Sequence, residues 1–228
     1  MPYASSSRRR TPSKGDLRED AILDAAERQL EANGHAAITI SGLMTDVGIS
    51  RAGFYFYFGS KNDVLAALVE RTVAALHESI DTLPDSGTAG PMALIGELLK
   101  RAETMWSEHG SVMRMALDLA PTVPAIDRAW SSAADASAQS AIEIAVRAGV
   151  PDDDTEQGAR RLVRALVAMT ERSYYRASAA AASSTATSPA RATRRPQTGH
   201  RETGHQETSL PQTTQTLMII WQRALALP

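Results

Sequence analysis

The chain has 228 residues, of which 43% are hydrophobic and 22% charged, and its formal net charge is −2. This length and apolar content suit one or two folded domains with a sizeable core, and they exclude a chain that is disordered throughout. The absence of cysteine excludes disulfide scaffolds, cysteine nucleophiles and thiolate metal sites, and it agrees with a reducing cytoplasm. No uncharged stretch approaches the roughly 20 apolar residues of a spanning helix. The arginines at 8–10 precede no apolar stretch, so we expect no secretory signal.

The N-terminal region divides into a basic arm and a helix. Residues 1–15 are rich in Ser, Pro and Arg and show no hydrophobic periodicity, which predicts a disordered basic arm. Asp16-Leu-Arg-Glu19 has the form of a capping box, so we expect order to begin at Asp16. Apolar residues then recur at helical spacing until Asn33-Gly34, where the helix is expected to end.

The rest of the chain predicts further helices. Thr39 is expected to cap a short helix that ends before Gly48, and Ser50 to cap the next one. Ser60-Lys-Asn-Asp63 is a second capping-box pattern and opens a long helix. Later helices are predicted over residues 91–108, 111–120, 124–148, 155–178 and 211–226. Because nearly every apolar run has a helical period, the fold class is predicted to be all-α with about nine helices.

One stretch lacks the apolar residues that the others carry. Residues 179–207 consist mainly of Ala, Ser, Thr, Pro, Arg, Gly and His, with almost nothing to bury. This composition predicts a disordered, slightly basic loop between the last two helices.

The most informative cluster is Phe54-Tyr-Phe-Tyr-Phe58, which holds all three phenylalanines and two of the five tyrosines. The window from Val47 to Lys61 contains no acid. On a helix that starts near Ser50, Phe54 and Phe58 share one face, whereas Arg51 lies on another. Aromatic clusters on helices usually serve packing. The position of this one, after a helix–turn pattern and before a capped long helix, favours a helix-turn-helix that contacts DNA.

Two segments resemble the DNA-binding domain of the tetracycline-repressor (TetR) family: Thr39-Ile-Ser-Gly-Leu43 and Gly48-Ile-Ser-Arg-Ala-Gly-Phe-Tyr-Phe-Tyr-Phe-Gly-Ser-Lys61. The amino-acid sequence of residues 54–58, together with Met169-Thr-Glu-Arg172 and Trp221, is similar to that of the ethionamide-resistance repressor branch of the family. The resemblance implies a three-helix helix-turn-helix domain over residues 16–61 and a helical ligand-binding and dimerisation domain over residues 62–228. The positions that correspond to family DNA contacts are Thr39, Ser41, Ser50, Arg51, Gly53, Tyr55, Tyr57 and Lys61. Position 53 departs from the family, because many members carry Thr there.

The C-terminal part contains all three tryptophans, on three different predicted helices. Large aromatic and methionine side chains suit an adaptable apolar cavity, although most tryptophans in helical domains lie in a core or an interface. Guided by the resemblance, we predict a ligand-binding set of Trp106, Met113, Trp130, Met169, Thr170, Tyr174 and Trp221. Thr170 stands where the similar branch has Asn. No charged residue of this part looks buried, so we expect a small, apolar, uncharged effector.

Two helices carry apolar stripes that fit a subunit interface. The stripe on residues 155–178 consists of Leu162, Leu166 and Met169, and the stripe on residues 211–226 consists of Leu217, Ile220, Trp221 and Leu225. Two such helices from each of two subunits would form a four-helix interface, which predicts a homodimer.

The expected function is that of a regulator. The residues show no phosphate loop, no nucleophile elbow and no metal-binding histidine spacing, and Asp152-Asp-Asp154 has the wrong offsets for a calcium loop. We therefore expect no catalysis, cofactor or metal. The prediction is a bacterial, cytoplasmic repressor, located at the nucleoid when bound to DNA and with no membrane partner, which a small apolar effector releases from a palindromic operator. A helical adaptor protein without DNA affinity is one alternative, and a small-molecule-modifying enzyme is another.

Overall fold

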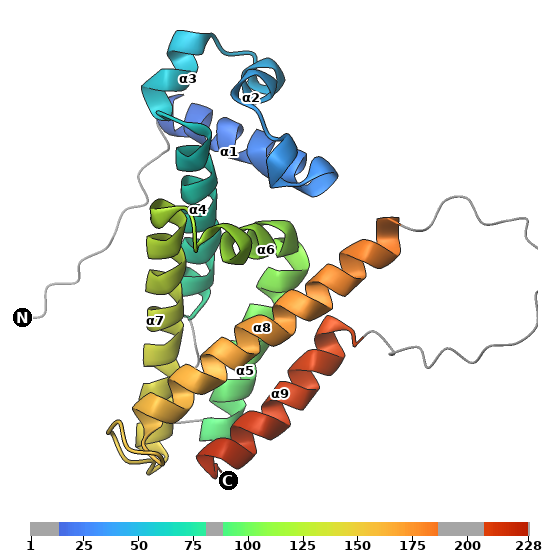
Figure 1. The fold of residues 1–228 in the computed structure, drawn as a ribbon. Coiled ribbons are helices and arrows are strands. Elements are labelled where there is room, and N and C mark those ends of the chain that lie inside the picture. Colours follow the sequence, from blue (N-terminus) through green and yellow to red (C-terminus); the bar gives the residue numbers. More distant parts are fainter. Residues whose placement is uncertain (1–13, 81–88, 187–207, 228) are drawn as a thin grey trace, which may run out of the picture. The chain divides into compact units, whose positions relative to one another are not determined.

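A computed structural model of the protein describes residues 14–80, 89–186 and 208–227. These residues form nine α-helices and one short 3-10 helix, and they contain no strand (Figure 1). The predicted all-α class is confirmed. The chain divides into two compact units between Leu68 and Val69.

The first unit consists of α1 (Lys14–Asn33), the 3-10 turn His35–Ala37, α2 (Ile40–Val47), α3 (Arg51–Tyr57) and the beginning of α4 (Lys61–Ile80). The sequence-based boundary at residue 61 marks the start of α4. The structural division lies further along this helix, because Val64, Leu65 and Leu68 are fully buried within the first unit. The remaining core of the unit is supplied by Ile22, Leu23, Leu30, Ile38, Leu43, Phe54 and Phe58.

The turn between α2 and α3 confirms the predicted caps. The Thr39 hydroxyl accepts the N–H of Gly42 at 3.1 Å, and the Ser50 hydroxyl accepts the N–H of Gly53 at 3.1 Å. Gly48 adopts the left-handed conformation with φ 68°, which glycine reaches without a Cβ penalty. The turn therefore joins α2 to α3 with only three residues, 48–50, between the helices.

The start of α1 was predicted two residues too late, since the helix begins at Lys14 rather than Asp16. Asp16 lies in the first turn, where its carboxylate faces the positive end of the helix dipole instead of acting as the cap. Residues 14–15 of the predicted arm are therefore helical, and residues 1–13 lie outside the described part of the chain.

The second unit contains the end of α4 and five further helices: α5 (Pro91–Glu108), α6 (Gly110–Leu119), α7 (Pro124–Arg147), α8 (Ala159–Ala186) and α9 (Leu210–Leu225). Helix α8 packs against α7, α9, α6 and α5, and α5 also packs against α9 and α7. Figure 1 shows α8 and α9 side by side. The helices predicted over residues 91–108, 111–120, 124–148 and 211–226 agree with the structure to within about one residue.

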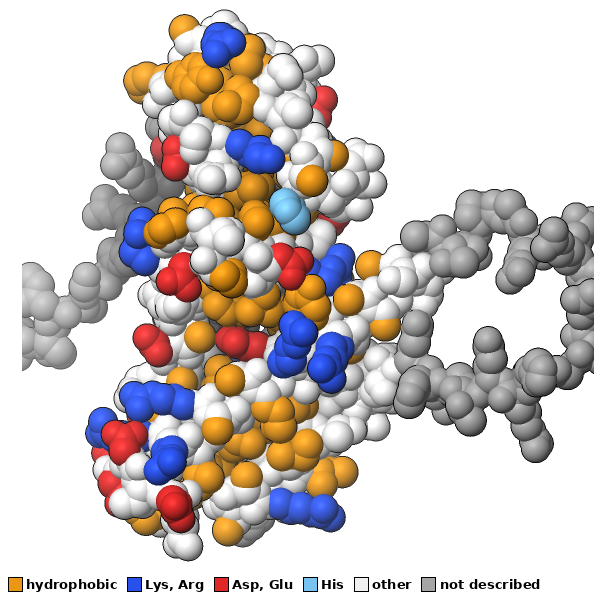
Figure 2. Space-filling model, in the orientation of Figure 1, with side chains coloured by type: hydrophobic (Ala, Val, Ile, Leu, Met, Phe, Trp, Pro, Cys, Tyr) orange, Lys and Arg blue, Asp and Glu red, His pale blue; other side chains and the backbone are white. Residues whose placement is uncertain are grey.

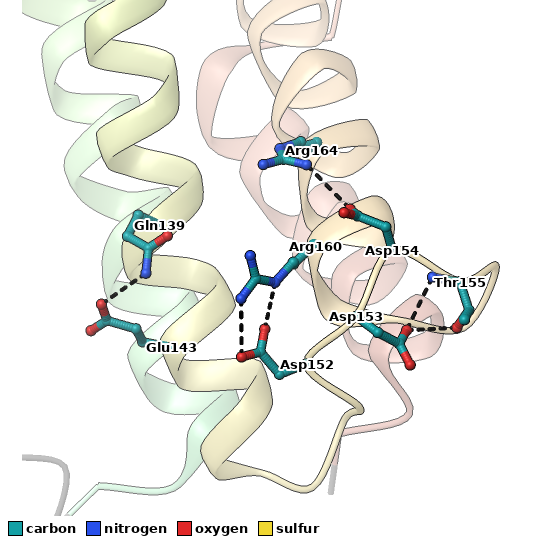
Figure 3. A network of polar contacts seen from close by, with 8 residues as sticks. All are labelled: Gln139, Glu143, Asp152, Asp153, Asp154, Thr155, Arg160 and Arg164. Carbon is teal, nitrogen blue, oxygen red and sulfur yellow. Dashed lines mark hydrogen bonds and ion pairs between the residues drawn. The ribbon is translucent and has the colours of Figure 1, made fainter.

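Helix α8 begins later than predicted, at Ala159 instead of residue 155. The preceding turn is held by Asp153, whose carboxylate accepts both the N–H and the hydroxyl of Thr155 (Figure 3). Gly158 is buried against the backbone of Asp153, so that a Cβ there would collide with it. Asp152 and Asp154 pair with Arg160 and Arg164 of the first turns of α8, which shows a structural role for the acidic run.

Helix α8 also ends later than predicted, because residues 179–186 continue it. This segment includes five alanines, the strongest helix formers, and the hydroxyls of Ser183 and Ser184 donate to backbone carbonyls four residues earlier. The disorder predicted for residues 179–186 is therefore wrong. Residues 187–207 of the predicted loop lie outside the described residues.

Candidate nucleic-acid interface and ligand cavity

Helix α3 is anchored by its two inward-facing phenylalanines. Phe54 and Phe58 are buried, and their ring centroids lie 6.2 Å apart. Ser50 caps the helix at its N-terminus, and the Phe58 N–H closes it on the Phe54 carbonyl. The predicted division of the aromatic run into a packing face and an outward face is confirmed.

The outward face of α3 presents one cation and two large aromatic rings. The Arg51 guanidinium lies over the Tyr55 ring, 5.4 Å from its centroid, and Tyr55 is 43% exposed. Phe56 is 80% exposed, and hydrophobic side chains gather over α3 in Figure 2. An exposed guanidinium beside aromatic rings can contact phosphate, a guanine edge and a thymine methyl group.

Sequence reasoning missed Phe56 as a candidate contact. It assigned the outward face to Arg51, Tyr55 and Tyr57 and did not consider the middle ring of the aromatic run. The signal was available, because Phe56 falls two positions from each buried phenylalanine and therefore points away from the packing face.

The other predicted DNA contacts fall into three environments. Thr39, Ser41 and Ser50 are exposed at the starts of α2 and α3, where Thr39 and Ser50 also cap the helices. Gly53 is half-buried behind the Ser50 hydroxyl. Tyr57 is half-buried and lines a shallow depression with Lys14, Leu17 and Arg18.

Lys61 differs from the expected free cation. Its ammonium donates to the carbonyl of His35 at 3.4 Å, and the side chain is half-buried. This hydrogen bond ties the start of α4 to the 3-10 turn, so Lys61 has a structural contact within the first unit.

The second unit encloses a cavity of about 100 Å³ between its helices. Six of the seven predicted ligand-binding residues line it: Trp106, Met113, Trp130, Thr170, Tyr174 and Trp221. They come from α5, α6, α7, α8 and α9. Met169 does not line this cavity and is half-buried elsewhere on α8.

The rings of the cavity pack against one another. Trp106 lies edge-on to Trp130 with centroids 6.5 Å apart, and it lies 6.3 Å from Tyr174. Apolar side chains of α5, α7 and α8 complete the lining. The arrangement forms an aromatic pocket of the kind that binds small, largely apolar molecules.

Comparison with known proteins identifies the first unit. Residues 22–68 match the family model described as bacterial regulatory proteins, tetR family. These residues are therefore similar to the N-terminal domain of the TetR family of regulators.

The chain also has relatives that match it over about half of its length or less. The chain is 32% identical over 124 residues to the HTH-type transcriptional regulator EthR of Mycolicibacterium smegmatis, covering 54% of this chain and 57% of that protein. It is 43% identical over 79 residues to EthR of Mycobacterium tuberculosis (strain CDC 1551 / Oshkosh), covering 35% and 37%. The matches thus span about half or less of these relatives.

The fold of this chain is shared by solved structures. A TetR-like transcriptional regulator from Rhodococcus sp. RHA1 superimposes with a TM-score of 0.65 at 19% identity, covering 95% of this chain and 99% of that one. The proteins compared are named as transcriptional regulators.

Several polar groups of the aromatic cavity are occupied by partners inside the protein. The Trp221 indole N–H donates to the Thr170 hydroxyl at 3.0 Å. The Tyr174 hydroxyl donates to the carbonyl of Leu99 at 2.9 Å and lies 2.8 Å from the Thr214 hydroxyl. Burial raises the pKa of Tyr174 to about 12, so this hydroxyl stays neutral.

The cavity also contains a carboxyl group that sequence reasoning missed. Glu171 lines the cavity, and burial raises its pKa to about 7, although a hydrogen bond from Trp130 opposes this shift. The expectation that no charged residue of this unit is buried was wrong, because Glu103 is buried and Glu171 is half-buried. Glu171 was overlooked because it sits between two arginine-rich turns of α8, which made this stretch look solvent-exposed.

Two further expectations concern metals and membranes. Within residues 14–80, 89–186 and 208–227, no group of three or more His, Asp or Glu side chains is placed to hold a metal ion. In the same residues, every helix is too short or too polar for a membrane span.

Proposed function

We propose that this protein is a homodimeric transcriptional repressor of the TetR family that binds a palindromic operator and is released from it by a small molecule. The outward face of α3 is the observation that carries this proposal. Its acid-free setting, the exposed Arg51 and the exposed rings of Tyr55 and Phe56 match what a helix in the major groove of DNA requires.

The hydroxyls at the starts of α2 and α3 complement this face. Thr39, Ser41 and Ser50 are exposed, and helix N-termini together with hydroxyl groups are common phosphate contacts. In this proposal they position α3, whereas Arg51, Tyr55 and Phe56 read the bases. Tyr57 and Lys61 contribute at the edge, because both are half-buried.

A dimer of the second unit would supply the second recognition helix. The predicted stripe needs correction, since Leu166, Leu217, Trp221 and Leu225 are buried within the chain itself. The exposed apolar residues of α9 are Met218, Ile219 and Ile220, and Figure 2 shows a hydrophobic area over α9 and the neighbouring part of α8. We propose that α8 and α9 pair with their copies through this area, leaving the cavity inside each subunit.

The cavity is the proposed effector site. Trp106, Trp130 and Trp221 place one ring each from α5, α7 and α9 at one small space, and Val73 of α4 completes the lining. Because α4 continues without a break into the first unit, a ligand that shifts α4 can change the presentation of α3. We place the protein in the bacterial cytoplasm, at the nucleoid when bound to DNA, with no membrane partner.

The test is the binding of operator DNA by Tyr55 variants. An electrophoretic mobility shift titration should show a loss of about tenfold or more in affinity for Tyr55→Ala, equal to about 1.4 kcal/mol. Tyr55→Phe separates the hydroxyl from the ring, and Tyr175→Phe in the second unit is the control.

Unchanged DNA affinity of a folded Tyr55→Ala protein would remove α3 from the interface. If the unaltered protein binds no DNA in a salt-dependent manner, the adaptor alternative replaces the repressor. Turnover of a ligand in the cavity would instead support the enzyme alternative.

A further inference from the structure

We propose that the effector of this cavity carries a cationic nitrogen, which binds against the carboxylate of Glu171 among the aromatic rings. The inference rests on the proposed effector site and gives the chemical class of its ligand: an amine or quaternary ammonium group attached to a small apolar body.

The first observation is the position of the carboxylate. Glu171 lines the cavity from α8, one residue after Thr170 and one turn before Tyr174 and Tyr175. Burial raises the pKa of its carboxyl group, and the Trp130 side chain of α7 interacts with this group and lowers its pKa by less. Among the described residues, no Lys, Arg or His side chain pairs with it. The side chain is half-buried, so its charged form loses part of its hydration, and the protein supplies no cation that compensates this loss.

The second observation is the set of rings that share the space. Trp106, Trp130 and Tyr174 line the same cavity as Glu171, and the centroid distances of 6.5 Å and 6.3 Å place them around one small volume. The faces of aromatic rings attract cations, and tryptophan does so most strongly. Rings and a carboxylate together select a positive group that also has apolar surface.

The neutral polar groups of the cavity compete poorly for a polar ligand. The Thr170 hydroxyl already accepts from Trp221, and the Tyr174 hydroxyl is held by Leu99 and Thr214. The two carboxylate oxygens of Glu171 offer several acceptor positions to a ligand in the cavity. The volume of about 100 Å³ fits a small ligand or a cationic head group, and Met105 and Met113 can adapt to a larger body.

The experiment compares two ligands of the same shape, phenyltrimethylammonium and tert-butylbenzene, which differ in charge. All three tryptophans of the chain line the cavity, so intrinsic fluorescence reports binding directly. At pH 8, Glu171→Gln should weaken binding of phenyltrimethylammonium by about tenfold or more. Binding of tert-butylbenzene should change by less than about twofold. Glu143→Gln, an exposed carboxylate of α7, makes the same charge change away from the cavity and should alter neither.

Three outcomes would overturn the inference. The first is equal weakening of both ligands by Glu171→Gln, which would show a packing role. The second is unchanged binding of the cation in this variant, and the third is failure of the unaltered protein to bind the cation at millimolar concentration.

The pH dependence of ligand affinity tests the inference on the unaltered protein, without a variant. Affinity for the cation should fall about tenfold or more from pH 8 to pH 5.5, because the carboxyl group becomes protonated, and affinity for tert-butylbenzene should stay constant. The other titratable group of the lining is Tyr174, which is neutral throughout.

The charged groups on the helices around α8 are Glu97, Lys100, Arg101, Glu103 and Glu108 of α5, Arg114 and Asp118 of α6, Asp127, Arg128, Asp135, Glu143 and Arg147 of α7, and Arg223 of α9. None lines the cavity, and the pKa of Glu103 is lowered by its hydrogen bond to Lys100 despite burial. The imidazole of His109, at the junction of α5 and α6, is also outside the lining. A pH-independent affinity for the cation would contradict the role of Glu171.

These measurements need no DNA. A protein that binds the cation through Glu171 but no operator would refute the repressor and leave the ligand class in place. A protein that binds operator but not the cation would refute the ligand class and leave the repressor in place.

Discussion

Arg51 combines two properties that a base-reading side chain needs. It is exposed at the first turn of a capped helix, and the Tyr55 ring 5.4 Å away restrains its guanidinium. A restrained guanidinium loses less freedom on binding than a free one, and its fork matches the two acceptors of guanine. Position and restraint together distinguish Arg51 from the many other exposed arginines of the chain.

Arg51→Ala should therefore weaken operator binding and relax its specificity. We expect a loss of about 1–3 kcal/mol at one base pair, measured by titrating the protein against operators substituted at each position. Arg51→Lys keeps the charge and should restore phosphate attraction without restoring base preference. Arg128→Ala, an exposed arginine of α7, is the charge-matched control. A uniform loss across all operator sequences would assign Arg51 to phosphate contact alone.

Glu171 predicts a pH-dependent stability. Its pKa is raised from 4.5 to about 7 in the folded protein, so the folded state binds this proton more tightly than the unfolded state. The stabilisation is complete below about pH 4.5 and is lost as the pH rises toward 7, by an amount of about 3 kcal/mol at most. Glu171→Gln should remove this loss, so that its melting temperature exceeds that of the unaltered protein more at pH 8 than at pH 5. An equal difference at both pH values would show that the carboxyl group is not buried in solution.

At the level of helices, local signals predicted what depends on neighbours in sequence. The caps at Thr39 and Ser50 and the glycine turn between them depend on residues within four positions, and the structure has each of them. The ends of α8 were wrong for two different reasons. The contact of Gly158 with Asp153 fixes the start of the helix. The helix ends later than predicted, because the helix propensity of alanine decides its end and not the burial of apolar side chains.

The cavity residues also differ in whether local sequence could predict them. Its tryptophans could be predicted because large aromatic residues are rare in this chain and stand out on separate helices. Glu171 could not, since its burial arises from packing of α8 against α7 and α5, far away in sequence. Similarly, the interface stripe assigned to α9 proved to be its core face, because one apolar periodicity cannot separate burial within a chain from burial between chains.

Gly158→Ala should destabilise the second unit. The added Cβ would collide with the backbone of Asp153, and relieving the collision must disturb the turn that carries the pairs of Asp152 and Asp154 (Figure 3). We expect a cost of about 1–3 kcal/mol, seen as a lower melting temperature by circular dichroism. Gly90→Ala is the matched control, because a Cβ there meets open space. A melting temperature equal to that of the control would show that the turn adapts freely.

Binding to both half-sites of a palindromic operator requires a dimer of the protein. Ile219 is 51% exposed in the single chain and lies in the apolar area of α9, together with Met218 and Ile220. Ile219→Glu would place a carboxylate in that area and should convert the dimer to monomers in sedimentation velocity at micromolar concentration. Gln139→Glu on α7 adds the same charge elsewhere and should leave the dimer intact. A dimer that survives Ile219→Glu would move the interface to another surface.

In the proposed function, the protein reads an inverted repeat through α3. The most direct measurement is selection of short genomic fragments by the purified protein at two salt concentrations, followed by sequencing. We predict that the fragments share an inverted repeat with half-sites about one DNA turn or somewhat more apart, and that this enrichment persists at the higher salt. Recovery of unrelated sequences that disappears at the higher salt would contradict the claim, because it would show only electrostatic attraction to DNA.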